Sequence, residues 1–301
     1  AVRAVHLRRS DSGEVTMVNC WQEAFEQPLC RAGLDTEASD IRGQGLQRMA
    51  QRIAGVDVPV WVNLPGRDVL GRFLRLPPMK DREVSALLDK EVDRQFPIGR
   101  DELMIAKWLQ SEKEANDDGS RCGALIACRD RVALERLALF NDAGIEPAAV
   151  QCDPLALVNF AAFEFHNQFS EQRCEAASPL PSLAFIDAGA TAVTFLVVSG
   201  TAFWFRSLDG GGEDFTAQLA RGGVMTAEQA EKCKRDPATL RAPSVHFAPI
   251  EERCAATGKR LQQAVKDADD FMPPFQTDAV WTFGGASLMH GWISHVLGEQ
   301  A

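Results

Sequence analysis

Residues 183–200 have the sequence LAFIDAGATAVTFLVVSG, which is an apolar run, a short turn and a second apolar run. Short apolar runs bounded by turn residues are typical of buried β-strands. The stretch predicts strands at Leu183–Ile186 and Ala192–Val198, and a third strand at Thr201–Arg206 follows the Ser199-Gly200 turn. The second half of the chain therefore starts with a strand–turn–strand unit that has the motif D-x-G-x-T at its first turn.

The turn Asp187-x-Gly189-x-Thr191 contains residues that can surround a phosphate. Gly189 permits a backbone conformation in which consecutive N–H groups point at an anion, and the Thr191 hydroxyl adds a donor. Asp187 can hold a hydrated Mg²⁺, which prefers carboxylate, phosphate and water oxygens. A tight hairpin with a glycine and a capping aspartate explains the same pattern, so both interpretations stay open here.

The first half of the chain repeats this unit. Residues 1–7 (AVRAVHL) have the apolar register of residues 192–198 (AVTFLVV), and strands are predicted at Val2–Arg8 and Glu14–Cys20. A loop equivalent to residues 187–191 is expected just before Ala1, so we expect the chain to be a trimmed form of a longer protein. The repeat indicates an α/β fold made of two related halves.

The remaining periodicities predict how the halves are elaborated. Further elements are expected at 38–54 (helix), 58–64 (strand), 69–76 (strand), 81–95 (helix), 103–109 and 122–128 (strands), 130–143 (helix before Gly144), 154–165 (helix), 213–221 (helix), 226–237 (helix opened by a capping box), 250–272 (helix), 279–283 (strand) and from Gly284-Gly285 to 297 (helix). These elements indicate a first domain of residues 1–65 and 149–180, an inserted β-α-β-β-α subdomain of residues 66–148, and a second domain of residues 181–301. The second domain is expected to carry a helical insert at about residues 213–275.

Composition excludes several classes of protein. The 301 residues are 46% hydrophobic and 25% charged, and 42 acidic against 32 basic residues give a net charge of −10, which argues against broad nucleic-acid binding. No stretch approaches the ~18–20 apolar residues that span a bilayer. Eight cysteines form no C-x-x-C pair and five histidines show no ligand spacing, which indicates reduced thiols in a cytosolic protein without a histidine metal site.

Three further groups of residues are candidates for a site. Gly284-Gly285-Ala286 follows an apolar strand and opens a helix, where amides can contact a nucleotide, although any strand-to-helix turn can contain glycines. Glu231 and Lys234 share one helix face and suit either contact with an adenosine or a solvated ion pair. Asp153 precedes Pro154 at a helix start, where it either caps the helix or positions a water molecule.

The order of these motifs resembles the actin-like ATPase fold, and within it the PilM family of type IV pilus assembly. The similarity covers nearly the whole chain and is most specific over residues 183–298. The matching stretches are residues 185–200, 206–212, 227–234 and 282–288, with residues 64–66, 76–80, 91–97 and 141–153 in the first half.

The resemblance implies four subdomains around a central cleft that holds ATP and Mg²⁺, with residues 66–148 as the insert shared with the division protein FtsA. It implies phosphate contacts at Asp187, Gly189 and Thr191, with Asp187 toward Mg²⁺, and adenosine contacts at Glu231, Lys234, Gly284 and Gly285. The Gly211-Gly212 turn is counted with the cofactor-binding residues, and Asp153 is the connecting carboxylate and the one catalytic candidate. Two parts of the family pattern, the first D-x-G loop and the elements after the last helix, are expected outside residues 1–301.

These expectations favour a cytoplasmic ATP-binding scaffold and at most a slow ATPase. The resemblance implies that it docks the short cytoplasmic N-terminus of a PilN-like inner-membrane protein, in a groove of the first domain and the insert, and is peripheral to the membrane without inserting into it. Self-association stays open. The alternatives are a sugar-type kinase on the same fold, a nucleotide-free adaptor, and a division or type II secretion platform component. A kinase needs a general-base carboxylate facing a small-molecule pocket in the first domain, and the sequence indicates none.

Overall fold

The computed structural model describes residues 1–25, 35–116, 118–165, 180–200, 202–221, 225–236, 243–272 and 275–297. The chain divides into two compact units, residues 1–64 with 131–151 and residues 65–130 with 152–301. The three-part division expected from the sequence stays a prediction. Cys30, Cys174 and the expected polar linker 168–179 lie outside the described residues.

The first unit contains two separate two-stranded sheets and two helices. β1 pairs with β2 in antiparallel register, with an irregularity between His6 and Leu7, and β3 pairs with β7. The elements are β1 (Val2–Arg9), β2 (Val15–Glu23), α1 (Asp35–Ile53), β3 (Val60–Leu64), α3 (Asp130–Asp142) and β7 (Pro147–Cys152). The hairpin predicted from the internal repeat is therefore confirmed.

Helix α1 packs against the β1–β2 hairpin. Gly45 leaves room for the ring of Phe25 and the side chain of Val2, and a Cβ at Gly45 would lie 2.9 Å from the ring. The Glu23 carboxylate, at the end of β2, pairs with the guanidinium groups of Arg48 and Arg52 on α1. Helix and hairpin are thus held by both packing and charge.

The second unit contains a three-stranded and a four-stranded sheet, ordered β4-β6-β5 and β10-β9-β8-β11. The elements are η2 (Gly66–Asp68), β4 (Val69–Leu76), α2 (Asp81–Gln95), η3 (Arg100–Glu102), β5 (Leu103–Leu109), η4 (Glu112–Glu114), β6 (Arg121–Arg129), α4 (Asp153–Glu164), β8 (Leu180–Ala188), β9 (Ala192–Ser199), β10 (Ala202–Asp209), α6 (Gly212–Ala220), α7 (Ala227–Arg235), α8 (Pro243–Phe271), β11 (Phe275–Phe283), η7 (Gly285–Leu288) and α9 (Trp292–Leu297).

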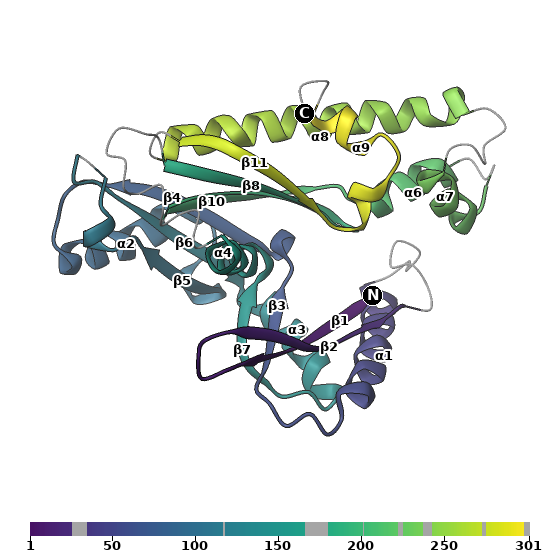
Figure 1. The fold of residues 1–301 in the computed structure, drawn as a ribbon, viewed down its shortest axis with the longest axis horizontal. Coiled ribbons are helices and arrows are strands. Elements are labelled where there is room, and N and C mark those ends of the chain that lie inside the picture. The colour runs from purple at the N-terminus through teal and green to yellow at the C-terminus, as the bar shows by residue number, and fades with distance from the viewer. Residues whose placement is uncertain are drawn as a thin grey trace. The chain divides into compact units, whose positions relative to one another are not determined.

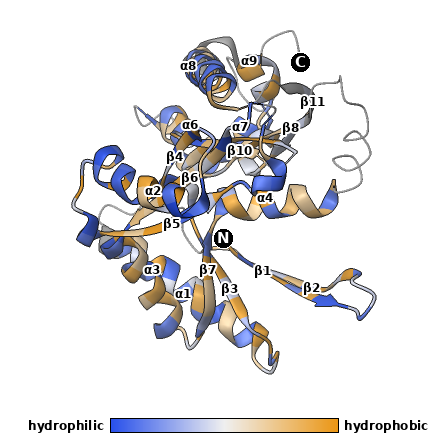
Figure 2. Ribbon diagram, turned by 90° about the vertical axis from the view of Figure 1, so that its left-hand side faces the viewer, coloured by the Kyte–Doolittle hydropathy of each residue, from blue (hydrophilic) through white to orange (hydrophobic). Residues whose placement is uncertain are grey.

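The four-stranded sheet is covered on both faces, which explains its continuous apolar sequences. Strand β8 pairs antiparallel with β9 and parallel with β11. Helix α8 runs along the sheet (Figure 1), and its buried side chains share one core cluster with those of β8, β9 and β10. On the other face, Phe165 at the end of α4 contacts Phe185 and Trp281, and α4 is drawn mostly in hydrophobic colours in Figure 2.

Aromatic side chains join the two sheets of this unit. The Phe73 ring on β4 lies 5.3–6.0 Å, between ring centroids, from the rings of Phe203, Trp204, Phe205 and Phe271. This cluster makes β4 and β10 neighbours without a backbone ladder between them. The third strand predicted after the Ser199-Gly200 turn is confirmed as β10, and its three aromatic side chains are each at most 4% exposed.

Most predicted elements of the described residues are confirmed, one strand was missed and the predicted starts of two helices were wrong. β7 was not predicted at all, and the sequence started the long helix at Ile250 although α8 begins at Pro243. The predicted last helix does not open at Gly284-Gly285: a short 3₁₀ turn, η7, comes first and α9 starts only at Trp292. Among the described residues, no helix has the length and apolar character that crossing a bilayer requires.

Candidate functional site

The turn between β8 and β9 lies at the end of the four-stranded sheet. Asp187, the penultimate residue of β8, stands opposite Thr194 on β9 and Phe283 on β11. The amide of Gly189 donates to the Ala192 carbonyl oxygen at 2.9 Å, which closes the turn. The motif predicted from the sequence therefore forms a tight hairpin at the point where three strands end or begin.

A second turn, Gly210-Gly211-Gly212, is interlocked with the first. The amides of Gly212 and Glu213 donate to the carbonyl oxygens of Gly189 and Ala190, at 3.0 and 2.8 Å. A Cβ at Gly211 would lie 2.5 Å from the Ala190 carbonyl group, a distance that no side chain tolerates. Gly211 is therefore required by the close approach of the two backbones.

The interlocked turns leave two backbone donors unused. Among the residues that the structure describes, the amides of Gly189, Gly210, Gly211, Gly212 and Glu213 all have acceptors within the protein. The amides of Ala190 and Thr191 and the hydroxyl of Thr191 have none within the same described part of the chain. Three donors in two consecutive residues have the chemistry that an anion site needs.

The end of β11 meets the same turn. Gly284 has φ +84°, and a Cβ there would lie 2.2 Å from the Ala188 carbonyl oxygen and 2.7 Å from a carboxylate oxygen of Asp187. Gly285 has no neighbouring heavy atom within 4 Å of the Cβ position. Gly284 is thus needed for the backbone geometry beside Asp187, while Gly285 faces open space.

Helices α6 and α7 are joined by a buried ammonium group. Lys234 is 5% exposed, and its Nζ donates to the Gly212 carbonyl oxygen and the Thr216 hydroxyl, each at 3.0 Å, and to Glu231 Oε2 at 2.5 Å. Burial raises the pKa of Glu231, but hydrogen bonds from Lys234 and Thr216 outweigh it and leave the pKa below its usual value. The ion pair is therefore present, but the interpretation that it is solvated was wrong.

Asp153 is the first residue of α4 and is mostly withdrawn from solvent. Burial raises the pKa of this carboxyl group to about 6, and the charges of Asp187 and Asp68 act in the same direction, against a hydrogen bond from the Gly66 amide. The N-cap of α4 is Cys152, and no side chain caps this helix, so the interpretation of Asp153 as the cap was wrong. The two carboxylates of Asp153 and Asp187 are electrostatically coupled.

The structure thus brings all the predicted site residues into one region of the second unit. Gly212 is the link between the two halves of the region, because a Cβ there would lie 3.3 Å from Ala286 and 3.5 Å from Lys234 Nζ. Within the described part of the chain, no three His, Cys, Asp or Glu groups gather closely enough to hold a metal ion. A magnesium ion at Asp187 would therefore need oxygens from a bound phosphate and from water.

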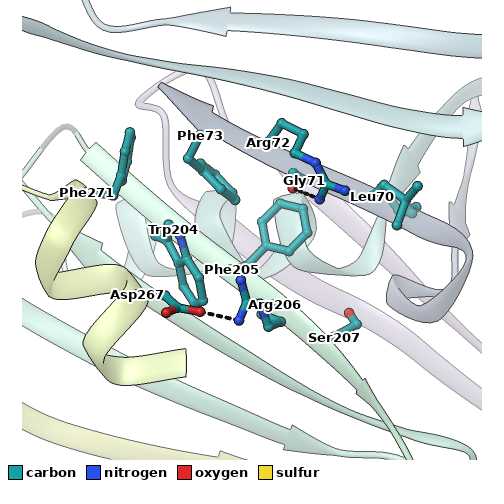
Figure 3. Close-up of a pocket in the computed structure, with 11 residues that line it drawn as sticks. Leu70, Gly71, Arg72, Phe73, Trp204, Phe205, Arg206, Ser207, Asp267 and Phe271 are labelled. Atoms are coloured by element: carbon teal, nitrogen blue, oxygen red, sulfur yellow. Dashed lines mark hydrogen bonds and ion pairs between the residues drawn. The ribbon is translucent and has the colours of Figure 1, made fainter. Parts of the chain in front are cut away.

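A cavity of about 410 Å³ lies elsewhere in the second unit. Its lining comes from β4, β10 and the end of α8 (Figure 3), and it contains none of the predicted site residues. Among the lining residues, the Arg206 guanidinium group stacks on the Trp204 ring and pairs with the Asp267 carboxylate. Because Arg206 and Asp267 are paired with each other and Arg72 donates to backbone carbonyl oxygens, we assign the candidate site to the turns and not to this cavity.

Sequence reasoning missed four residues that shape the site. Asp214, Thr216 and Arg253 hold the Gly210–Gly212 turn, and Gly66 donates to Asp153. A signal for Asp214 was present, since an acidic residue three positions after an N-cap is typical of a capping box. No local pattern marks Thr216 or Arg253, which reach the turn only in the folded chain.

Each half of the chain starts with a β-hairpin, β1–β2 and β8–β9, and in the second half β11 lies parallel to β8 beside the two interlocked turns. These features define an α/β protein of the actin-like class. The family model described as type IV pilus assembly protein PilM matches residues 1–245. The chain therefore belongs to the PilM family of type IV pilus assembly proteins. No curated protein matches it by sequence.

One solved structure shows the same fold at low identity, and two others match more weakly. The chain is similar to a structure described as the PilM-PilN type IV pilus biogenesis complex, with a TM-score of 0.74, 16% identity, and coverage of 98% of this chain and 83% of that chain. It also matches the cytoplasmic domain of EpsL, an inner-membrane component of the type II secretion system of Vibrio cholerae (TM-score 0.39, 12% identity, 73% and 70% covered). A third match is the ethanolamine utilization protein EutJ from Carboxydothermus hydrogenoformans (TM-score 0.37, 18% identity, 55% and 52% covered). The low TM-scores of the EpsL and EutJ matches support no conclusion about this chain.

Proposed function

We propose that this protein is an ATP-binding, actin-like scaffold of type IV pilus assembly. The observation that carries the proposal is the pair of unused amides at Ala190 and Thr191, which lie three and four residues after Asp187. Donors suited to phosphate thus stand beside a carboxylate suited to a divalent cation. Membership of the PilM family supports a role in pilus assembly.

The residues present fit Mg-ATP in the following roles. The Ala190 and Thr191 amides and the Thr191 hydroxyl would bind phosphate oxygens, with Gly189 setting the shape of their turn. Asp187 would hold hydrated Mg²⁺, which neutralises phosphate charge when bound. Gly284 and Gly285 would border the nucleoside, and Glu231 would accept from it while Lys234 fixes the position of Glu231.

Asp153 is proposed to orient a water molecule toward the terminal phosphate. A carboxyl group with a pKa of about 6 can accept a proton near neutral pH and hold it briefly, which suits slow hydrolysis. We propose that turnover is slow and that the nucleotide-bound state itself is the functional one. Binding can favour one conformation only through contacts that differ between conformations.

The partner and the location belong to the same proposal. The similar solved structure is described as a complex of PilM with PilN, which supports a PilN-like partner for this chain. We propose that the protein is cytoplasmic and reaches the inner membrane through the short N-terminus of that partner. The nucleotide state would set the affinity for this segment.

The test is the affinity for a fluorescent peptide of the PilN N-terminus, measured by anisotropy with Mg-ATP, Mg-ADP or no nucleotide. We expect the affinity to differ by about 5- to 150-fold between nucleotide states, as for typical coupling free energies. Equal affinities in all three states would refute the coupling. Sugar-stimulated ATP turnover above about 1 s⁻¹ would instead indicate a kinase.

A nucleotide-free adaptor is the second candidate, and one observation favours it. Five amides of the two turns already have internal acceptors, so the turns keep their shape without a ligand. An adaptor would bind the PilN peptide with unchanged affinity, and saturating Mg-ATP would leave its melting temperature unchanged, because only a ligand that binds the folded state stabilises it.

A further inference from the structure

A relay of polar contacts connects helix α8 with the Gly210–Gly212 turn. Arg253 on α8 pairs with Asp214, with 3.1 Å between Nη2 and Oδ1. The other carboxylate oxygen of Asp214 accepts the Gly211 amide at 2.8 Å. The guanidinium group therefore reaches the turn through one carboxylate, and each oxygen of that carboxylate has its own partner.

The turn that this relay holds controls the position of the two unused amides. Gly211 lies directly against the Ala190 and Thr191 backbone, where a Cβ would come within 2.5–2.6 Å of three of its atoms. The amides of Glu213 and Gly210 add hydrogen bonds to the same segment, at the Ala190 and Thr191 carbonyl oxygens. A shift of Gly211 therefore displaces the Ala190–Thr191 segment.

Two neighbouring contacts on α8 show that the relay belongs to a longer stripe. Arg260 donates to the Asp209 carbonyl oxygen at 2.7 Å, and Asp267 pairs with Arg206 on β10. Residues 253, 260 and 267 are spaced by seven, which places them on one face of the helix. Contacts with β10 and its last residue hold this face of α8, and the face ends beside the Gly210–Gly212 turn. Arg253 is therefore held where its guanidinium group pairs with the Asp214 carboxylate.

We propose that Arg253 is a positioning residue of the candidate phosphate site and acts through Asp214. This inference rests on the proposed ATP function. Arg253 holds the Asp214 carboxylate, Asp214 holds the Gly211 amide, and Gly211 keeps the Ala190 and Thr191 donors in place. The arrangement makes the relay sequential, so Arg253 has no effect on the site once Asp214 is removed.

The experiment is a double-mutant cycle on the affinity for Mg-ATP, measured by isothermal titration calorimetry. Arg253→Ala is expected to weaken binding about fivefold, which corresponds to about 1 kcal/mol, the upper range for a half-exposed ion pair. Asp214→Ala is expected to weaken it about tenfold, since the Gly211 amide also loses its acceptor. The double variant is expected to equal Asp214→Ala alone, and Arg253→Lys to stay within about twofold of the wild type.

The control is Arg94→Ala, which removes a surface ion pair with Glu91 on α2 and should leave the affinity unchanged. Effects of Arg253 and Asp214 that simply add would overturn the relay, because a guanidinium that bound phosphate directly would act without Asp214. An Arg253→Ala variant with wild-type affinity would also overturn it.

Hydrogen exchange of the nucleotide-free protein separates this inference from the proposed function. Arg253→Ala and Asp214→Ala are both expected to increase amide exchange at residues 210–213 by about fivefold or more, with Arg94→Ala unchanged. If the wild type does not bind Mg-ATP, the proposed function fails. The amide exchange rates at residues 210–213 then test by themselves whether Arg253 and Asp214 hold the turn. Unchanged exchange at residues 210–213 in both variants would overturn it.

Discussion

Two glycines of the candidate site, Gly211 and Gly285, differ in what surrounds them. A Cβ at Gly211 would meet the Ala190 carbonyl group at 2.5 Å, and the backbone there cannot yield as a side chain can. A Cβ at Gly285 would meet nothing within 4 Å. The first glycine is thus needed for folding of the turns, and the second is not.

This difference predicts opposite outcomes for the same substitution. Gly211→Ala should lower the free energy of unfolding by about 1–3 kcal/mol, as overpacking does, whereas Gly285→Ala should leave it within about 0.5 kcal/mol. Urea unfolding followed by circular dichroism measures both. Equal stabilities of the two variants would contradict the interlocked turns.

Asp153 predicts a pH dependence of stability. Its carboxyl group holds a proton up to about pH 6 in the folded protein, against an ordinary value of 3.8. The folded state therefore binds more protons in this window, and the contribution of Asp153 to the free energy of unfolding falls as pH rises from about 4 to 7. Asp153→Asn should be more stable than the wild type at pH 7 by about 2 kcal/mol, with the difference vanishing near pH 4.

Chemical unfolding of both proteins at pH 4, 5, 6 and 7 tests this. A wild type at least as stable as Asp153→Asn at pH 7 would show that the carboxylate is not penalised by burial and by Asp187. A difference independent of pH would assign the effect to packing and not to charge.

At the scale of single residues, the sequence predicted which side chains meet but not how they are used. The D-x-G-x-T and G-G patterns identified Asp187, Thr191 and Gly284, because their chemistry and their turns are local. The capping interpretation of Asp153 was wrong because the amide that this carboxylate accepts belongs to Gly66, far away in the sequence. Desolvation and long-range partners leave no mark in the local sequence.

At the scale of elements, helix α7 is held by two cations that share the Glu231 carboxylate. Lys234 is buried and bonded to the Gly212 carbonyl oxygen, whereas Arg235 reaches Glu231 Oε1 at 3.1 Å and has a side chain 65% exposed. The two residues differ in burial and share their partner. Comparing the stabilities of variants at these two positions therefore measures how much the buried contacts of Lys234 contribute to the attachment of α7 to α6.

Lys234→Ala is expected to lower the free energy of unfolding by about 1–3 kcal/mol, because it removes the buried hydrogen bonds of the ammonium group to the Gly212 carbonyl oxygen, the Thr216 hydroxyl and Glu231. Arg235→Ala is expected to cost less than about 1 kcal/mol, as for exposed pairs. Thermal and urea unfolding of both variants gives the comparison. A Lys234→Ala variant as stable as Arg235→Ala would contradict the buried network.

The elements themselves were largely predictable, since periodicity and capping signals are local. β4 and α2 match their predicted bounds, and the Thr226 side chain accepts from the Gln229 amide as the capping box predicts. β7 was missed because its six residues start with proline and include two alanines, which have low strand propensity. Its pairing with β3 outweighs this propensity, and that pairing is non-local.

At the scale of the whole molecule, the internal repeat predicted the fold class, and family membership agrees with it. The repeat is visible because β1 and β9 need the same apolar register to begin equivalent hairpins. The division into two units is harder to predict from the sequence, because each unit combines segments that are far apart along the chain. Which of these segments pack together is decided only in the folded protein. The net charge of −10 argues against nucleic acid as a partner, but it does not identify the partner that the protein binds.

The most direct test of the central claim is calorimetric titration of the protein with ATP in the presence of Mg²⁺. We predict saturable binding at one site, weakened about tenfold by Thr191→Val and by Asp187→Asn, which each remove one contact to the phosphates or the cation. Thr16→Val, on exposed β2, should bind as the wild type does. A wild type that takes up no Mg-ATP at millimolar concentration, or three variants with identical affinity, would contradict the assignment of a nucleotide site to these turns.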